Sequence, residues 1–245
     1  MRPLLLASSL ITALTLTACG SVTREIAIET PIRPKLDVSM FQRVLVAGFL
    51  SGGTDEVDGN AETIRLLRSQ LRNKSELRVI DADPLPLLEE SAEKPAAGEK
   101  LAIKDEKDLE PREHIFADAD YWKRVGEEYQ NPLIVTGTIL FTPHQRSGYV
   151  QREEEVYDTF GRRRVVPVRS FQERKGYILK PKFIFIDGRT GATIYSETFR
   201  EEVLYNANQT TPALSTYFEL MERLIPSFLN TLSSQKVKGA RVLLQ

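Results

Sequence analysis

The side chains that most often carry catalysis or hold metals are scarce in this sequence. Its 245 residues include one cysteine, Cys19, and two histidines, His114 and His144. One thiol cannot build an internal disulfide framework or a cysteine metal cage, and two histidines leave little for zinc. No Gly-x-Ser-x-Gly turn is present, and the many carboxylates show no pattern that pairs them for acid–base work. We therefore expect no enzyme activity, no metal and no cofactor.

One short loop could hold an anion. Ser51-Gly52-Gly53-Thr54 follows an apolar segment and precedes a helical pattern, a position where backbone N–H groups of α/β proteins often bind phosphate. The loop lacks the Gly-Lys-Ser/Thr and Gly-x-Gly-x-x-Gly patterns, and the acidic residues at 55, 56 and 58 would repel a phosphate. We expect a plain connecting loop and keep a nucleotide or small-anion binder at Ser51–Thr54 as an alternative.

Basic and aromatic side chains are interleaved over residues 146–176. This segment holds eight basic and five acidic residues. Such a mixture suits contact with another protein or with an anionic surface, because arginine and aromatic residues are enriched at interfaces. The plainer alternative is a hydrated hairpin whose arginines and glutamates pair across its strands. The candidate contact residues are Arg152, Tyr157, Phe160, Arg162, Arg163, Arg164 and Phe171.

The first residues have the pattern of an export signal. Arg2 gives a positive start, and the uncharged apolar stretch 4–16 has the length of a signal-peptide core and is too short to span a bilayer. It ends in Leu16-Thr17-Ala18-Cys19-Gly20, which resembles the lipobox of bacterial lipoproteins. The resemblance implies cleavage between Ala18 and Cys19, diacylglycerol on the thiol, and acylation of the new amine. Gly20, in place of aspartate, implies the outer membrane. A buried structural Cys19 is the alternative.

Composition narrows the remaining possibilities. With 41% hydrophobic and 27% charged residues the chain is typical of a globular protein. A formal charge of −1 and a pI near 6.2 give no overall reason to bind nucleic acid. We divide the chain into a lipoprotein signal peptide (1–18), a lipidated cysteine with a flexible tether (19–41), a single α/β domain (42–235) and a tail (236–245). Within the tether, residues 26–28 could pair as an edge strand.

The periodicity of apolar residues predicts the elements of the domain. We expect strands over 43–50, 77–82, 133–142, 182–186 and 193–205, and helices that begin at caps Asn60, Asp118 and Thr211. Strand, helix and strand within 43–82 form a βαβ unit, which implies a parallel pair. A charged, mobile insertion is expected over 84–113, and a β-ribbon over 146–179 that turns near Phe160-Gly161. The fold class is α/β, with a mixed parallel and antiparallel sheet (βαβαβ followed by β-hairpins) packed by helices, among them a long C-terminal helix.

This order of elements resembles a group of bacterial envelope proteins. The group comprises the curli secretion lipoprotein, the N-terminal domain of TolB, and the outer-membrane lipoprotein activators of penicillin-binding proteins. Two local matches carry the likeness: Val135-Thr136-Gly137-Thr138 within a strand, and Asp187-Gly188-Arg189-Thr190-Gly191 between two strands. The resemblance covers about residues 41–235. It implies a domain that binds partners or assembles, with no catalytic residues to transfer.

The expected function is therefore an outer-membrane-anchored, periplasm-facing lipoprotein that acts as a non-catalytic protein-interaction or assembly module in envelope biogenesis. Its partners would be the membrane, through the lipid, and an envelope protein or anionic surface, with further copies of the chain as an option and no nucleic acid. A subunit of an oligomeric curli-type secretion channel is an alternative. It is disfavoured because residues 151–155 and 162–164 would put charge on both faces of the ribbon, and a charge facing lipid costs ~2–4 kcal/mol at the bilayer midplane.

Overall fold

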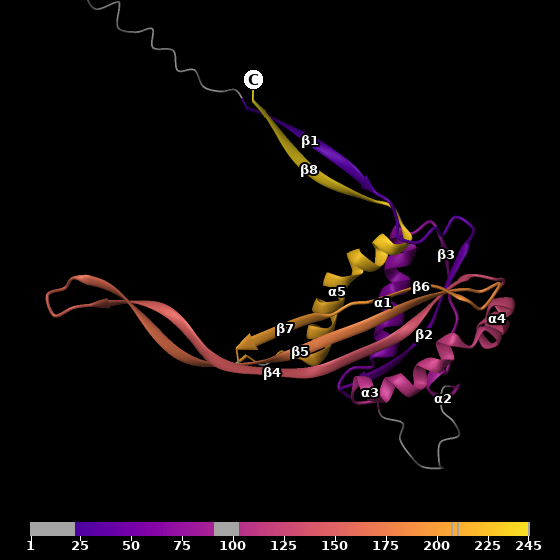
Figure 1. Ribbon diagram of the computed structural model, residues 1–245, viewed down its shortest axis with the longest axis horizontal. Coiled ribbons are helices and arrows are strands. Elements are labelled where there is room, and N and C mark those ends of the chain that lie inside the picture. Colours follow the sequence, from indigo (N-terminus) through magenta and orange to yellow (C-terminus); the bar gives the residue numbers. More distant parts are fainter. Residues whose placement is uncertain (1–22, 91–102, 207, 210, 245) are drawn as a thin grey trace, which may run out of the picture. The chain divides into compact units, whose positions relative to one another are not determined.

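A computed structural model describes residues 23–90, 103–206, 208–209 and 211–244 (Figure 1). The chain divides into two compact units: Arg33–Ser233, which holds the α/β fold, and a unit made of the two terminal segments on either side of it. Signal-peptide residues 1–18 and the predicted lipidation site Cys19 lie outside the described residues, so lipidation stays a prediction.

The larger unit is built on one mixed sheet. Strand order is β3-β2-β4-β5-β6, and β7 also pairs with β5. The strands are β2 (Arg43–Gly53), β3 (Arg78–Ile80), β4 (Leu133–Tyr157), β5 (Arg163–Asp187), β6 (Thr193–Thr198) and β7 (Glu201–Asn206). β2 runs parallel to β3 and β4, whereas β5 is antiparallel to β4, β6 and β7. The predicted α/β class with a mixed sheet and a long C-terminal helix is confirmed.

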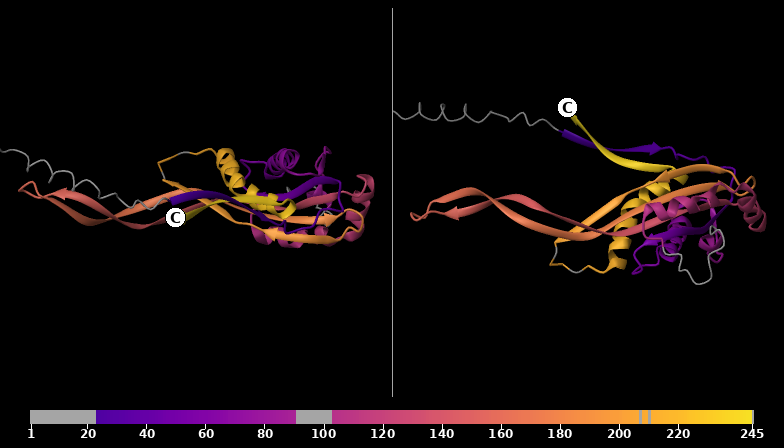
Figure 2. Two further views of the ribbon diagram at one scale, coloured as in Figure 1. Left: turned by 90° about the horizontal axis from the view of Figure 1, so that it is seen from above. Right: turned by 60° about the horizontal axis from the view of Figure 1, so that its bottom comes forward.

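Helices cover both faces of this sheet (Figures 1 and 2). α1 (Gly59–Lys74) and α5 (Ala213–Leu232) contribute to one apolar core, and α2 (Leu87–Glu90), α3 (Glu106–Leu109), η1 (Glu110–Ala117) and α4 (Ala119–Glu128) contribute to a second. Along β2, Val44 and Val46 belong to the first core and Leu45 and Ala47 to the second, as the alternation of a strand requires. Burial on both faces explains why this strand reads as a continuous apolar run.

The start of α1 lies slightly earlier than the sequence predicts. Asp58, rather than Asn60, is the cap, and its Oδ1 accepts from the backbone N–H of Ala61 at 2.9 Å. The Asn60 side chain instead joins the helix to β2, since its Oδ1 accepts from the backbone N–H of Phe49 at 2.8 Å. Both side chains suit a cap, so the sequence alone did not separate them.

The other two predicted caps have different outcomes. Asp118 caps α4 and accepts from the backbone N–H of Tyr121 at 2.9 Å. α5 begins one residue later than expected, with Pro212 instead of Thr211 at the cap position and no side-chain cap hydrogen bond. Proline there needs no N–H partner, since the first N–H groups of a helix have none within it. α5 then continues through Pro226 to Leu232.

The charged segment 84–113 differs from the mobile insertion that its composition predicts. Leu87, Ile103 and Leu109 are buried in the second core, at 5% exposure or less. Lys180 and Lys182 of β5 reach across to Glu106 and Glu113 of this segment, at 2.9 and 2.6 Å. Isolated apolar residues among the charges therefore dock both described ends of the segment on the sheet. Its residues 91–102 lie outside the described part of the chain.

The two ends of the chain also differ from the predicted tether and tail. β1 (Thr23–Ile32) and β8 (Gln235–Leu244) form an antiparallel pair, in register from Thr23↔Leu244 to Ile32↔Gln235. Residues 33–41, assigned to the tether, belong to the larger unit, where Leu36 donates from its backbone N–H to the Thr231 carbonyl at 2.9 Å and Phe41 is buried. The strand considered for residues 26–28 is therefore present, and it extends over all of β1.

Candidate functional site

β4 and β5 continue beyond the rest of the sheet as a two-stranded ribbon (Figures 1 and 2). Their register is unbroken from Leu133↔Asp187 to Tyr157↔Arg163. β2 accompanies β4 only as far as Phe141, and β7 accompanies β5 only as far as Arg174. No side chain between residues 142 and 177 is buried. The sequence predicted a ribbon over this segment, and the structure shows that the ribbon packs on neither core.

A tight turn closes the ribbon at its far end. Asp158 Oδ1 accepts the backbone N–H groups of Arg162 at 2.9 Å and Phe160 at 3.0 Å. These hydrogen bonds, chiefly that from Arg162, lower the pKa of Asp158. Gly161 has a φ of +73°, a left-handed conformation that glycine adopts without steric cost. The turn therefore lies where the sequence places it and presents Phe160, whose side chain is 81% exposed.

Apolar side chains line both faces of the ribbon. Tyr149 lies opposite Phe171, and their rings meet edge to face with centroids 5.5 Å apart. Both remain exposed, at 77% and 60%, as does Tyr157 at 66%. Alternation along the strands places four valines on the other face: they are Val150, Val156, Val166 and Val168. Contiguous exposed apolar groups of this kind mark binding surfaces more often than plain solvent-facing strands.

Acidic side chains form ion pairs with the arginines at the tip of the ribbon. Arg162 Nε lies 3.1 Å from Asp158 Oδ2, Arg164 Nε lies 3.7 Å from the same atom, and Arg163 pairs with Glu155. The Arg162 guanidinium also lies over the Phe160 ring, 5.3 Å from its centroid. These are the internal pairs that a hydrated hairpin would have. They reduce the positive charge at the tip and leave the aromatic rings exposed.

The seven candidate contact residues fall into three places on the ribbon. Tyr157, Phe160 and the arginines 162–164 gather at the tip, whereas Arg152 lies midway, opposite Val168. Phe171 is nearer the body, opposite Tyr149. Tyr149 and the valines complete this surface. Sequence reasoning passed over the valines because their common face depends on a register that one strand alone does not reveal.

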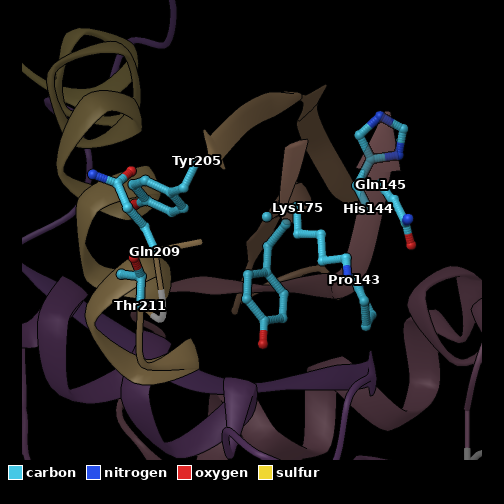
Figure 3. A pocket seen from close by; sticks show the side chains of 9 residues that line it. Pro143, His144, Gln145, Lys175, Tyr205, Gln209 and Thr211 are labelled. Atoms are coloured by element: carbon cyan, nitrogen blue, oxygen red, sulfur yellow. The ribbon is translucent and has the colours of Figure 1, made fainter. Parts of the chain in front are cut away.

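A cavity of about 520 Å³ lies where the ribbon leaves the body (Figure 3). Figure 3 shows Tyr205, Gln209 and Thr211 on one side of it and Pro143 and Lys175 on the other. The sequence did not suggest this site, because its walls come from β4, β5, β7 and the segment between β7 and α5.

Polar groups around this cavity are paired with carboxylates of the body. Tyr177 donates its hydroxyl to Glu56 Oε2 at 3.0 Å, and His144 Nε2 lies 3.4 Å from Glu202 Oε1. Tyr205 donates to Glu219. Burial is the main cause that raises the pKa of Tyr177 and Tyr205. Neutral, donating tyrosines suit hydrogen bonding to a ligand or partner more than nucleophilic chemistry.

The loop at Ser51–Thr54 does not offer the donors that an anion needs. Ser51–Gly53 complete strand β2, and the backbone N–H of Gly53 donates to the Ile103 carbonyl at 2.9 Å. The N–H of Thr54 donates to the Phe141 carbonyl, also at 2.9 Å. The adjoining cavity, of about 290 Å³, is lined by Asp55 and Asp58. Committed N–H groups beside two carboxylates give no support to the anion-binding alternative.

The remaining titratable groups are dispersed. His114 Nδ1 lies 2.8 Å from the Pro111 carbonyl, in a different part of the molecule from His144. Within the described ranges, no three His, Cys, Asp or Glu side chains gather as metal ligands would. The helices of the described part of the chain include none with the length and apolar character to cross a membrane.

Neither a family model nor a curated protein matches the chain. Among solved structures it is similar to the lipoprotein GNA1162 of Neisseria meningitidis, at 14% identity, with 77% of this chain and 98% of that chain covered and a TM-score of 0.35. It is also similar to the hypothetical protein CT253 of Chlamydia trachomatis, at 9% identity, with 78% and 98% covered and a TM-score of 0.39. A PDZ domain protein of Parabacteroides distasonis gives 9% identity, 89% and 39% coverage and a TM-score of 0.24. Likeness at these scores identifies no function.

Proposed function

We propose that this protein is a periplasm-facing lipoprotein, anchored in the outer membrane through Cys19, whose β4–β5 ribbon binds another protein during envelope assembly. The protein has no catalytic role in this proposal. Support for the anchor comes from the sequence, where the apolar stretch 4–16 leads directly into Leu16-Thr17-Ala18-Cys19-Gly20. Two or more acyl chains on one residue make membrane attachment stable, whereas a single chain holds only reversibly.

One observation carries the binding role: the ribbon exposes large apolar side chains and packs none of them on the body. Tyr149, Tyr157, Phe160 and Phe171 are all at least 60% exposed. An isolated two-stranded hairpin is only marginally stable in water. A partner that covers these rings would stabilise the ribbon, and aromatic residues are the usual anchors of such contacts.

A protein fits this surface better than an anionic polymer or lipid. Asp158 and Glu155 lie against the tip arginines, so an anion would have to displace existing pairs. The exposed rings and valines, by contrast, gain from burial at ~25 cal/mol per Å² of apolar surface. A membrane anchor would further assist binding, because it confines the ribbon to a thin layer and raises its effective concentration there.

The channel alternative gains no support from the register. Arg152 and Glu154 lie on the face of the ribbon that carries the valines, and Glu153 and Glu155 lie on the face that carries Tyr149. A strand that spans a bilayer needs one consistently apolar face. Charges on both faces suit a ribbon that works in water.

Photo-crosslinking in the native cell envelope tests the binding role. A photoreactive amino acid replaces Phe160 or Tyr149 in the full chain, and the matched control replaces Leu214 on α5, which is 44% exposed. We expect a discrete adduct of higher mass from both ribbon positions and none from Leu214. Equal labelling at Leu214, or no adduct from the ribbon, would contradict the proposal.

The anchor has its own test. Cys19→Ala removes the thiol that the lipid would modify, so we expect the variant to leave the outer-membrane fraction. Mass analysis of the wild-type protein should show a chain that begins at Cys19 and carries acyl groups. A Cys19→Ala variant that stays in the outer-membrane fraction would count against the anchor and would leave the ribbon's binding role untouched.

A further inference from the structure

The two outer edges of the ribbon expose different backbone groups. The N–H and C=O of one residue point to the same side of an antiparallel strand, and the side alternates from residue to residue. Phe141 accepts from Thr54 N–H, on the side of β4 away from β5. Pro181 accepts from Phe199 N–H, on the side of β5 away from β4. Because the register is unbroken, the odd-numbered residues of both strands present their backbone groups outward along the whole ribbon.

Proline interrupts the middle of only one of these edges. On β5, Pro167 is odd-numbered, so the outer edge lacks an N–H in its middle, and β7 covers that edge from Arg174 onward. On β4, Pro143 stands at the base, and residues 145–155 contain no proline. Among the described residues, no strand pairs with the outer edge of β4, the edge away from β5, beyond Phe141. An edge with regular donors and acceptors is a template for a further strand, and a proline within an edge is a device against one.

Charge is distributed unevenly along the β4 edge. Arg146 lies toward the base, Arg152 lies midway, and Glu153, Glu154 and Glu155 lie toward the tip. An incoming strand that runs antiparallel and carries the same distribution would set its acidic end against the basic end of β4. The sequence that meets this requirement by construction is β4 itself.

We propose that the β4 edge pairs with the β4 edge of a second copy of this chain, antiparallel and centred on Val150. This inference deepens the proposed function and rests on it, since it names the partner of the ribbon. Outward residues then pair with outward residues, as hydrogen bonding requires: Tyr149 lies opposite Gln151 of the second copy. Arg146 lies opposite Glu154 of the second copy, and the twofold symmetry repeats this pair.

Neighbouring registers are less favourable. A centre at Tyr149 brings Arg152 opposite Arg146 of the second copy, and like charges directly opposite each other are destabilising. A centre at Gln151 leaves Arg146 opposite Val156 and forms no ion pair. Every register centred on a residue keeps outward residues opposite outward residues. Hydrogen bonding therefore does not distinguish these three centres, and the charges select Val150.

The resulting assembly would close as a dimer. In the four-stranded sheet β5-β4-β4-β5, both new edges are β5 strands, which carry Pro167 and end against β7. The register also sets Tyr157 beside Pro143 of the second copy, so each tip reaches the base of the other ribbon, where the cavity of about 520 Å³ lies. Edge pairing over one strand buries little area, so confinement by the membrane anchor would supply the concentration that a weak interface needs.

A disulfide tests the register directly. Val150→Cys in the full chain would place two thiols across a non-hydrogen-bonded pair, whose Cα atoms lie ~4.5 Å apart, within the range that a disulfide spans. Val168→Cys is the matched control: it faces the same side, with 36% exposure against 40% for Val150, but lies on β5, roughly 20 Å from its counterpart, across three strand spacings and four residues along the strands. Mild oxidation of cell envelopes should cross-link Val150→Cys, with the bond mapped to residue 150 of both copies. Wild type, which has only Cys19, sets the background.

Charge reversal provides the second measurement. In the Val150→Cys background, Arg146→Glu alone or Glu154→Arg alone sets like charges opposite each other at two symmetric positions. We expect about a tenfold weaker association, which corresponds to ~1.4 kcal/mol, and recovery when both changes are combined. Failure of the double variant to recover would overturn this register.

The outcomes separate this inference from the proposed function. Cross-linking of Val168→Cys but not Val150→Cys would overturn the β4 interface. Photo-adducts from Phe160 to a different protein, with no disulfide from Val150→Cys, would overturn the second copy as partner and leave the binding role standing. A ribbon that gives neither photo-adducts nor the disulfide would overturn both.

Discussion

Shortening the ribbon should leave the stability of the body almost unchanged. Gly148 and Gln172 lie opposite each other, and both are even-numbered, so they form a hydrogen-bonded pair. Such a pair is the correct flank for a two-residue turn, and Asn-Gly is the sequence that such turns prefer. The variant therefore replaces residues 149–171 with Asn-Gly and keeps every strand pair nearer the body.

The expected change in the free energy of unfolding follows from burial. No side chain from 149 to 171 is buried, and none belongs to either core, so the deletion opens no cavity. What is lost is a set of cross-strand contacts worth ~0.2–1 kcal/mol each, offset by the entropy of ordering two strands. For a two-stranded ribbon these two contributions to the free energy of folding nearly cancel. We expect a change within about 1 kcal/mol, or roughly 2–4 °C in Tm.

The sole tryptophan makes the assay simple. Trp122 is fully buried in the body, at 0% exposure, so its fluorescence in urea reports unfolding of the body without a contribution from the ribbon. The m-value should also stay nearly unchanged, because it scales with the surface exposed on unfolding and the ribbon is exposed before and after. Disulfide formation and photo-adducts require the ribbon and should disappear. A loss of more than about 3 kcal/mol would show that the ribbon supports the body, and the separation of folding from binding would be refuted.

Three further predictions concern the body. The Arg189 guanidinium lowers the pKa of Asp187, so the ionised carboxylate stabilises the fold above about pH 4, and this contribution is lost as pH falls through the folded pKa. Asp187→Asn should therefore lower the free energy of unfolding by ~1–3 kcal/mol at pH 7 and by much less at pH 3, measured by urea unfolding at both pH values. Gly137→Ala should cost at least ~2 kcal/mol and lower the thermal midpoint, since φ is +143° and a Cβ would lie 1.8 Å from the Lys182 carbonyl oxygen. Tyr217→Phe should cost only ~1 kcal/mol in urea, because Thr63 still donates to Gly59, whereas Tyr217→Ala should cost ~3–5 kcal/mol.

The sequence predicts well those elements whose burial is continuous. The apolar run at 133–141 became the buried half of β4, because residues on both faces of a covered sheet must be apolar. α5 has Tyr217, Leu224 and Phe228 on its buried stripe, as helical spacing indicates. Asp187 and Gly191 form the hairpin turn between β5 and β6, where Gly191 has a φ of +72°.

Elements that depend on single residues or on distant partners were not predictable in the same way. Leu87, Ile103 and Leu109 are three apolar residues in a charged segment, too sparse to show a period, yet each is buried. β1 and β8 come from opposite ends of the chain, so no turn sequence joins them and predicts that they pair. The cavity beside the ribbon has the same origin, since its walls come from separate elements.

The candidate site shows how a buried core can fix the properties of an exposed surface. Which backbone groups of the ribbon face outward is decided at Phe141 and Pro181, inside the body, where their carbonyls accept from the N–H of Thr54, just after β2, and of Phe199, between β6 and β7. From there the unbroken register carries the same alternation to the tip, so the body determines that Pro167 interrupts the outer edge of β5 and that β4 stays regular. A one-residue slip at the base would exchange inward and outward groups and would put Pro167 into the ladder, where it would lose a hydrogen bond. The asymmetry that directs a second strand to β4 is therefore a consequence of packing in the sheet, and the charges of Arg146 and Glu154 act only on an edge that the core has already selected.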